Sequence, residues 1–166
     1  ALHFMRKANI QNGEKVLVNG AGGSIGTFAV QIARELGAEV TAVDSAIKEK
    51  MLRQIGADHF IDYVKEDFSK SGKSYDVIFS VVANTSYSNY VKALKPAGRY
   101  LMANPRLSDM LNSVMTNWFT DKSATFAFAE ENGLGYVISS IGRHEKSVDL
   151  DTGVALRTFG YNENNQ

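Results

Sequence analysis

The sequence predicts an α/β domain in which helices cover both faces of a doubly wound parallel sheet, giving three layers. Apolar, strand-like runs alternate with segments of helical periodicity over roughly the first 130 residues, and such alternation is typical of parallel sheets. Residues 75–82 are nearly all apolar in their second half, as expected for a strand that is buried on both faces. Right-handed crossovers then predict the strand order 3-2-1-4-5-6.

Six strands are expected from the β-rich runs at residues 15–20, 39–44, 59–63, 75–82, 99–104 and 124–129. The helix after the first strand is predicted from apolar residues at i, i+3 and i+4 spacing, and Gly37 ends it. Its predicted inner face comprises Ile25, Phe28, Ala29, Ile32, Ala33 and Leu36.

Three further helices are expected. Ser45 is predicted to cap the first of them, and a modest helix is predicted at residues 86–95. Residues 96–98, Pro-Ala-Gly, are expected to turn the chain into the fifth strand. Helical faces are indicated by two apolar stripes, the first with Ile47, Met51 and Ile55 and the second with Leu107, Met110, Leu111, Val114 and Trp118.

The predicted domain covers residues 1–131, and residues 132–166 form an atypical, glycine-rich segment. This segment holds five of the fourteen glycines and shows neither helical nor strand periodicity, although residues 136–141 could form a strand. The chain opens with ALHFMRKANI, without an initiator Met or a signal pattern. We therefore expect it to be part of a longer protein.

Composition excludes several function classes. Eighteen basic residues balance eighteen acidic ones, and 44% of the 166 residues are hydrophobic. The zero net charge gives no reason to expect nucleic acid or an anionic membrane as a partner. The chain has no cysteine, and its histidines, His3, His59 and His144, are scattered, so we predict no metal site. A cytoplasmic location is expected.

A cluster of glycines separates the first strand from the first helix. Ala21-x-Gly23-x-x-Gly26 is a dinucleotide fingerprint with its first glycine replaced by alanine, and Gly20-x-Gly22 overlaps it. Such a cluster allows a tight turn, a close backbone approach to a pyrophosphate, and close packing of helix on strand, the role that suits Gly26. The N–H groups of Ser24, Ile25 and Gly26 would face the phosphates.

An acidic residue completes this Rossmann pattern. Asp44 ends the second strand, 18 residues after Gly26, close to the ~20 residues expected for a group that binds the adenosine ribose. No lysine follows the glycines as in a P-loop. The stretch DFSKSGKS at residues 67–74 has Asp67 where a P-loop needs its leading glycine, so it is not interpreted as a phosphate loop.

These motifs, in this order, resemble the cofactor domain of the medium-chain dehydrogenases/reductases, and within them the quinone-oxidoreductase-like and zinc-type alcohol-dehydrogenase-like branch. The resemblance is carried by GEKVLVNGAGGSIGTFAVQIARELGAEVTAVDS, IGADHFIDY, YDVIFSVV and LKPAGRYLMA, and covers roughly residues 1–129. It implies an oxidoreductase that transfers hydride between NAD or NADP and a carbonyl or alcohol, enone or quinone substrate. It also implies that a separate N-terminal domain supplies the substrate pocket and any zinc.

The resemblance implies roles for further residues. Ser24 and Ile25 would donate backbone hydrogen bonds to the pyrophosphate, and Val82 and Ala83 would flank the nicotinamide. Asn104 follows the fifth strand, at the edge where ligands of such sheets bind.

The choice between NAD and NADP depends on three of the implied residues. Asp44 favours NAD, whereas Lys48 and Tyr63 lie where related proteins hold the 2′-phosphate of NADP. Because an unpaired carboxylate beside that phosphate would be unfavourable, the sequence slightly favours NAD.

Catalytic residues are not identified. Tyr87, Tyr90 and His59 are candidates by residue type only, so this chain alone is expected to bind the cofactor without turnover. The alternative function is a non-catalytic NAD(P)-binding module. A methyltransferase is disfavoured because the extended GGSIG start of the helix suits a pyrophosphate, and a short-chain dehydrogenase because the Tyr-x-x-x-Lys pair is absent at Tyr87 and Tyr90.

A homodimer is expected through the edge of the sixth strand. Residues 124–129 are apolar and uncharged, and such an edge promotes association unless it is paired. The family resemblance implies pairing with a second copy across a two-fold axis. The stripe from Leu107 to Trp118 could extend that interface, although core packing is the preferred interpretation for at least half of it.

Overall fold

The computed structural model describes residues 2–126, 134–138, 144–149 and 155–157. The chain divides into two compact units, residues 1–128 and residues 129–166. Each unit is described by itself.

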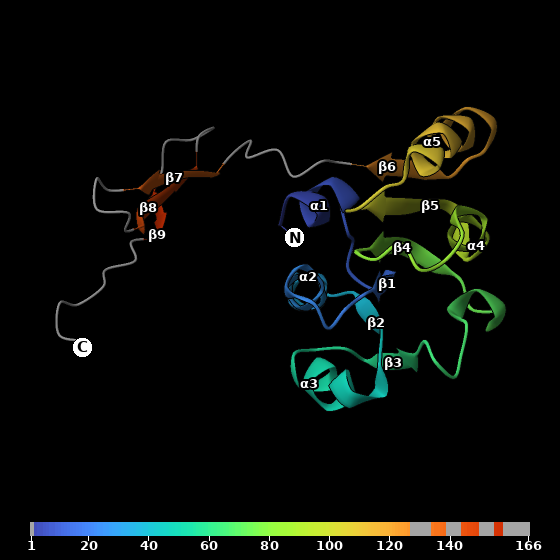
Figure 1. The fold of residues 1–166 in the computed structure, drawn as a ribbon, viewed down its shortest axis with the longest axis horizontal. Helices are drawn as coiled ribbons and strands as arrows, with labels where there is room; N and C mark the ends of the chain where they lie inside the picture. The colour runs from blue at the N-terminus through green and yellow to red at the C-terminus, as the bar shows by residue number, and fades with distance from the viewer. Residues whose placement is uncertain (1, 127–133, 139–143, 150–154, 158–166) are drawn as a thin grey trace. The chain divides into compact units, whose positions relative to one another are not determined.

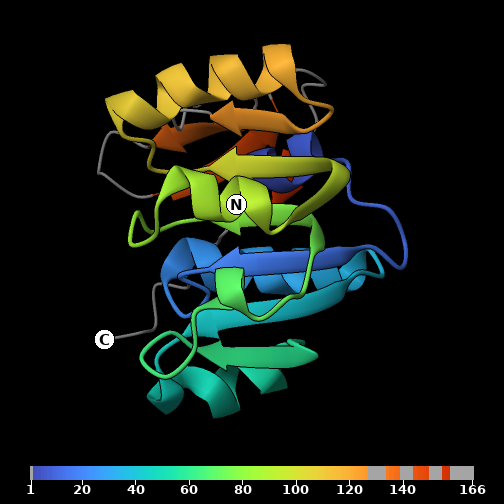
Figure 2. The same cartoon turned by 90° about the vertical axis from the view of Figure 1, so that its right-hand side faces the viewer.

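The first unit contains one parallel sheet of six strands in the order β3-β2-β1-β4-β5-β6. Every pair of neighbours is parallel, so the predicted fold class and strand order are confirmed. Figure 2 shows the strands stacked in this order with their arrowheads toward the same edge. The strands are β1 Lys15–Asn19, β2 Glu39–Asp44, β3 His59–Asp62, β4 Tyr75–Ser80, β5 Leu94–Met102 and β6 Ser123–Phe126.

Helices cover both faces of this sheet, and each face has its own core. Figure 1 shows α1, α2 and α3 on one side of the strands and α4 and α5 on the other. The first core joins Phe4 and Leu52 to Val16 and Phe79, and the second joins Tyr90 to residues of the opposite face. The helices are α1 Leu2–Ala8, α2 Ser24–Glu35, α3 Glu49–Gln54, α4 Tyr87–Lys92 and α5 Leu107–Phe119, with short 3-10 turns at Ala46–Lys48 and Phe68–Lys70.

Helix α1 has no counterpart in the sequence analysis. Its Phe4 and Met5 are buried, and the ring centroid of Phe4 lies 5.2 Å from that of Phe79 on β4. The opening segment of the chain therefore contributes to the core.

The inner face of α2 differs from the predicted one. Small residues are buried there, namely Gly26, Ala29, Val30 and Ala33, whereas Ile25, Phe28 and Leu36 are exposed. The glycine turn brings the helix close to the sheet, and at that distance only small side chains fit between them. The predicted face was wrong by part of a turn because helical periodicity does not account for side-chain size.

The predicted turn at residues 96–98 is part of β5. The register of β4 and β5 passes from Tyr75 opposite Leu94 to Val77 opposite Arg99, so residues 95–98 form an irregularity within the strand pair. Ala97 has a φ of 57°, and its N–H donates to Asp121 Oδ2 over 3.1 Å. The turn chemistry is present, but the ladder continues on both sides of it.

The predictions for the later helices are corrected in two places. Ile47 is exposed rather than buried, and the Ser45 hydroxyl makes no capping hydrogen bond. On α5 the buried residues are Ser113 and Thr116, whereas Leu107, Leu111, Val114, Met115, Trp118 and Phe119 are exposed. Core packing is therefore wrong for four of the five residues of the predicted stripe, and Met110 is half-buried.

The described part of the second unit is an antiparallel sheet in the order β7-β8-β9, with β7 Leu134–Ile138, β8 His144–Asp149 and β9 Ala155–Arg157. The strand considered at residues 136–141 overlaps β7, and its last three residues lie outside the described residues. Residues 127–129 of the predicted sixth strand also lie outside them.

Candidate functional site

The carboxyl ends of β1, β2, β4 and β5 bring the predicted site residues to one edge of the sheet. The strand order reverses between β1 and β4, and the crevice at such a point is where ligands bind in open α/β sheets. Gly20 follows β1 with a φ of 81°. A Cβ on Gly20 would lie 2.9 Å from Val82 Cγ1, so the turn after β1 contacts the loop after β4.

The glycines of the turn have separate structural reasons. A Cβ on Gly26 would lie 2.2 Å from the Gly20 carbonyl oxygen, and one on Gly22 would collide with Lys48 Cδ. Ala21 replaces a glycine without strain because the positive φ falls at Gly20. A Cβ on Gly23 would meet only the Gly20 oxygen at 3.7 Å, so packing within the protein does not require glycine there.

Helix α2 begins at this turn with unused donors. The N–H groups of Ser24, Ile25 and Gly26 donate to no acceptor within the described residues, and the N-cap residue Gly23 supplies no side chain. Ser24 and Ile25 are exposed. Such a helix start presents donors and a partial positive charge to an anion.

Asp44 is held by groups of the protein itself. Its Oδ2 accepts the Gly22 N–H over 2.7 Å, and its Oδ1 accepts the Ser45 N–H over 2.8 Å. Lys48 Nζ lies 3.1 Å from Oδ1. Burial raises the pKa of Asp44, but these hydrogen bonds and the lysine charge outweigh it, so the pKa lies below its usual value. The assumption that this carboxylate is unpaired was wrong.

The remaining predicted residues lie around the same edge. The Tyr63 N–H donates to the Asp44 carbonyl over 3.3 Å, and the Ala103 N–H donates to the Ser80 carbonyl over 3.0 Å, which places Asn104 just beyond β5. The side chains of Tyr63 and Asn104 are exposed. Arg106 Nη2 donates to the Ala83 carbonyl over 2.5 Å, and this contact fixes the loop that contains Val82.

A buried polar network beneath this loop escaped the sequence analysis. The Tyr90 hydroxyl lies 2.5 Å from Asn19 Nδ2 and 3.0 Å from Ser80 Oγ, and Asn19 Nδ2 also donates to Asn84 Oδ1 over 2.8 Å. Ser80 Oγ donates to the Val82 carbonyl over 2.7 Å. Burial raises the pKa of Tyr90, and the bonds from Ser80 and Asn19 only partly oppose it. The one local signal was Asn19, a polar residue at the end of an apolar strand.

The candidates for catalysis by residue type do not meet at this edge. Tyr90 belongs to the network, and the Tyr87 hydroxyl donates to Thr116 Oγ1 over 2.8 Å. His59 begins β3 at the opposite edge, where its Nε2 lies 2.8 Å from Glu39 Oε1. Within the described residues no three His, Cys, Asp or Glu side chains are grouped as metal ligands. None of the described helices has both the length and the apolar character needed to cross a bilayer.

The chain is similar in sequence to a known dehydrogenase family and to proteins named as reductases or oxidoreductases. Residues 24–104 match the family described as zinc-binding dehydrogenase. The chain is 30% identical over 128 residues to the medium chain reductase pydE of Acremonium sp., covering 69% of this chain and 35% of that protein. It is 36% identical over 104 residues to the mitochondrial NAD(P)H oxidoreductase RTN4IP1 of Mus musculus, covering 59% and 26%.

A solved structure shares the fold. The quinone oxidoreductase from Coxiella burnetii superposes with a TM-score of 0.69 over 78% of this chain and 40% of that chain, at 22% identity. The chain spans between 26% and 35% of the length of the two curated relatives described above.

Proposed function

The chain belongs to the medium-chain dehydrogenases/reductases as their nicotinamide-cofactor-binding domain, and we propose that it binds NAD(H) or NADP(H) across the carboxyl edge of its parallel sheet. The pyrophosphate lies against the start of α2, where the N–H groups of Ser24 and Ile25 donate to it. The adenosine ribose lies beside Asp44, and the nicotinamide lies by Val82, Ala83 and Asn104. Gly20 and Ala21 shape the turn, and Gly26 sets the distance between α2 and that turn.

The single observation that carries this proposal is Gly23. A positive φ explains Gly20, contact with backbone explains Gly26, and Gly22 lies against the side chains of Lys48 and Asp44. A Cβ on Gly23, by contrast, would enter nearly open space next to three unused N–H donors. Glycine at such a position is explained by the close approach of a ligand's pyrophosphate. The site therefore fits a dinucleotide.

NAD is the proposed preference. Oδ1 of Asp44 accepts the Ser45 N–H and faces Lys48, whereas Oδ2 accepts only the Gly22 N–H and keeps a lone pair for the 2′-hydroxyl of NAD. A 2′-phosphate would face this carboxylate, and it could gain Lys48 only by drawing that ammonium away from Asp44. Tyr63, exposed at the end of β3, would cover the adenosine side.

The test is a fluorescence titration of the chain with NADH and with NADPH. Gly23→Ala is expected to weaken NADH binding at least tenfold while leaving the urea midpoint unchanged, because its methyl group meets only the ligand. Gly72→Ala, at the opposite edge, is the control: because Gly72 has a φ of 71°, the substitution is expected to lower the urea midpoint but to leave the NADH Kd unchanged. Equal Kd values for wild type and Gly23→Ala would contradict the proposal.

The cofactor preference is tested separately. Asp44→Asn keeps an acceptor for the Gly22 N–H but removes the negative charge. The Kd values for NADH and NADPH are therefore expected to move closer together. Lys48→Gln is expected to weaken the binding of NADPH more than the binding of NADH. A wild-type preference for NADPH would overturn the proposed preference for NAD without touching the dinucleotide site.

The whole protein is proposed to be an oxidoreductase. A bound nicotinamide would supply or accept the hydride, and a carbonyl or alcohol, enone or quinone would be its partner. A domain outside this chain would shape the substrate pocket, so the chain alone is expected to bind NADH without oxidising it. The rival function, a binding module without chemistry, would be favoured if the full-length protein also showed no turnover with these substrate classes.

The chain is also proposed to form a homodimer at the β6 edge. Strand β6 ends the sheet, and the neighbouring α5 exposes large apolar side chains, with Trp118 at 79%. Light scattering is expected to give twice the 18.2 kDa chain mass. Trp118→Ser should reduce the measured mass to that of one chain, whereas Ile47→Ser, which removes an even more exposed apolar side chain elsewhere, should not. A wild-type monomer would contradict this proposal.

A further inference from the structure

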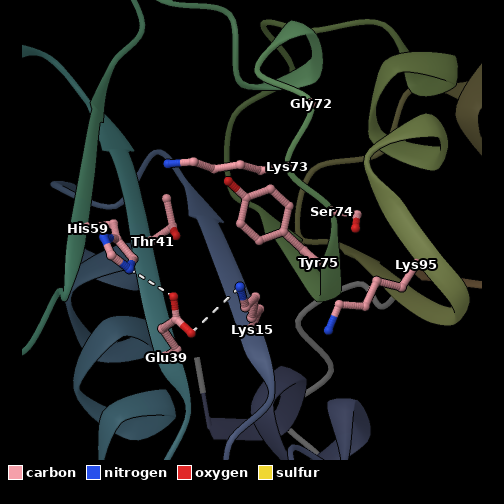
Figure 3. A pocket seen from close by; sticks show the side chains of 9 residues that line it. All are labelled: Lys15, Glu39, Thr41, His59, Gly72, Lys73, Ser74, Tyr75 and Lys95. Atoms are coloured by element: carbon pink, nitrogen blue, oxygen red, sulfur yellow. Dashed lines mark hydrogen bonds and ion pairs between the residues drawn. The ribbon is translucent and has the colours of Figure 1, made fainter.

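A cavity of about 450 Å³ lies at the amino edge of the sheet, opposite the candidate dinucleotide site. The first residues of β1, β2, β3 and β4 all line it (Figure 3). Its volume lies within the range of small-molecule sites, about 300–1,000 Å³. The lining residues that bear on its chemistry are Lys15, Glu39, Thr41, Lys73, Ser74 and Tyr75.

The cavity has an excess of positive charge. Lys95 Nζ pairs with Asp76 over 2.7 Å, and Lys15 Nζ lies 3.9 Å from Glu39 Oε2. Lys73, the third lysine of the lining, makes no ion pair within the described residues. Lys73 is therefore the lysine of the lining whose ammonium no carboxylate of the described residues pairs with.

The acceptors of the lining are already occupied. Glu39 Oε1 lies 2.8 Å from His59 Nε2, while Oε2 faces Lys15. The ammonium of Lys73 and the hydroxyl of Ser74 donate to no acceptor within the described residues, whereas the hydroxyls of Thr41 and Tyr75 lie beside each other.

Tyr75 indicates that something is missing from this set. Its side chain is only 2% exposed, yet its hydroxyl makes no hydrogen bond of normal geometry within the described residues. Burial raises the pKa of Tyr75, so the group stays a neutral donor, and the nearby Thr41 hydroxyl only partly opposes that rise. A buried hydroxyl without a well-formed hydrogen bond lowers the stability of the fold, and a ligand acceptor that reached it would remove this cost.

We propose that this cavity binds the phosphate group of a small phosphate monoester. Phosphate offers three charged acceptor oxygens and no competing donor, which matches a free ammonium beside several hydroxyl groups. The volume exceeds that of the ion, and the ring of Tyr75 provides a wall for the organic part of the ester.

The test is an NMR titration of the 166-residue chain with glycerol 3-phosphate at constant ionic strength, with glycerol and inorganic phosphate as comparison ligands. Saturable chemical-shift changes are expected at the amides of residues 73–75. The Kd should be lower for the ester than for inorganic phosphate, and glycerol should cause no saturable change. Equal Kd values for the ester and phosphate would overturn the assignment of the organic part.

Matched variants locate the site. Lys73→Gln is expected to raise the Kd for the ester at least tenfold, and Tyr75→Phe is expected to raise it several-fold. Lys70→Gln is the control, because Lys70 is exposed, pairs with Asp67 and does not line the cavity. An unchanged Kd in Lys73→Gln, or shifts centred on residues 20–26, would overturn the proposal. NADH binding is expected to be unaffected by Lys73→Gln, so the two sites succeed or fail separately.

Discussion

Tyr90 and Tyr75 pack into the same core on one face of the sheet, both with almost no exposed surface, but they serve opposite edges. The Tyr90 hydroxyl lies within hydrogen-bond distance of Asn19 and Ser80 below the loop that follows β4. Tyr75 lines the cavity at the amino ends of the strands, and its hydroxyl makes no hydrogen bond of normal geometry within the described residues. At the carboxyl edge the buried side chains bond to one another and the backbone N–H groups at the start of α2 stay unused, whereas at the amino edge it is side-chain donors that stay unused.

The largest expected effect would break the carboxyl edge. Gly26→Ala places a methyl group against the Gly20 carbonyl and the backbone of Ala21, and overpacking of this kind costs about 1–3 kcal/mol or more. We expect a loss near the upper end, about 3 kcal/mol, because backbone atoms cannot move aside as side chains can. Urea denaturation measures it. If Gly26→Ala lowers the free energy of unfolding by less than a typical surface substitution does, α2 can move away from the turn at no energetic cost.

The second effect compares the two tyrosines directly. Tyr90→Phe leaves buried Asn19 and Ser80 short of a partner, so about 1–3 kcal/mol of the free energy of unfolding should be lost. The loop with Val82 should loosen as well, and NADH should bind more weakly. Amide hydrogen exchange at residues 81–84 measures the loosening of the loop. If Tyr90→Phe is as stable as wild type, the Tyr90 hydroxyl does not stabilise the carboxyl edge.

The third effect concerns pH at the carboxyl edge. Asp44 has a folded-state pKa below its usual 3.8, so its ionised form adds stability above pH ~4, and this contribution is lost as the pH falls through the folded-state value. Asp44→Asn should be less stable than wild type at pH 6, and the difference should shrink toward pH 2. Thermal unfolding across this range tests the sign, and a constant difference would contradict it.

The smallest expected effect lies at the amino edge. Tyr75→Phe removes a hydroxyl that has no partner, so the free energy of unfolding should stay within about 0.5 kcal/mol of wild type or rise. The same urea experiment that measures Tyr90→Phe gives this value. A loss above 1 kcal/mol would show that the Tyr75 hydroxyl is already bonded, and the contrast between the two edges would disappear.

Local patterns were enough to predict the sheet, its strand order and the position of the turn at residues 20–26. Strand and helix periods repeat over a few residues, and right-handed crossovers leave one arrangement for them. The same patterns were misleading on α2 and α5. Periodicity identifies an apolar stripe, but it does not say whether that stripe meets the sheet or, as at Phe28 and Trp118, solvent.

By itself the sequence determined the fold class, the glycine turn and an acid at the end of β2, because each depends on neighbouring residues. Only the tertiary structure decided that the Gly22 N–H donates to Asp44, that Tyr90 reaches Asn19 across 71 positions, and that the Tyr75 hydroxyl makes no hydrogen bond of normal geometry within the described residues. These facts depend on which side chains meet after distant segments pack. Hydrogen bonds and ion pairs act only over a few ångströms, so their partners are set by the folded arrangement rather than by the order of residues.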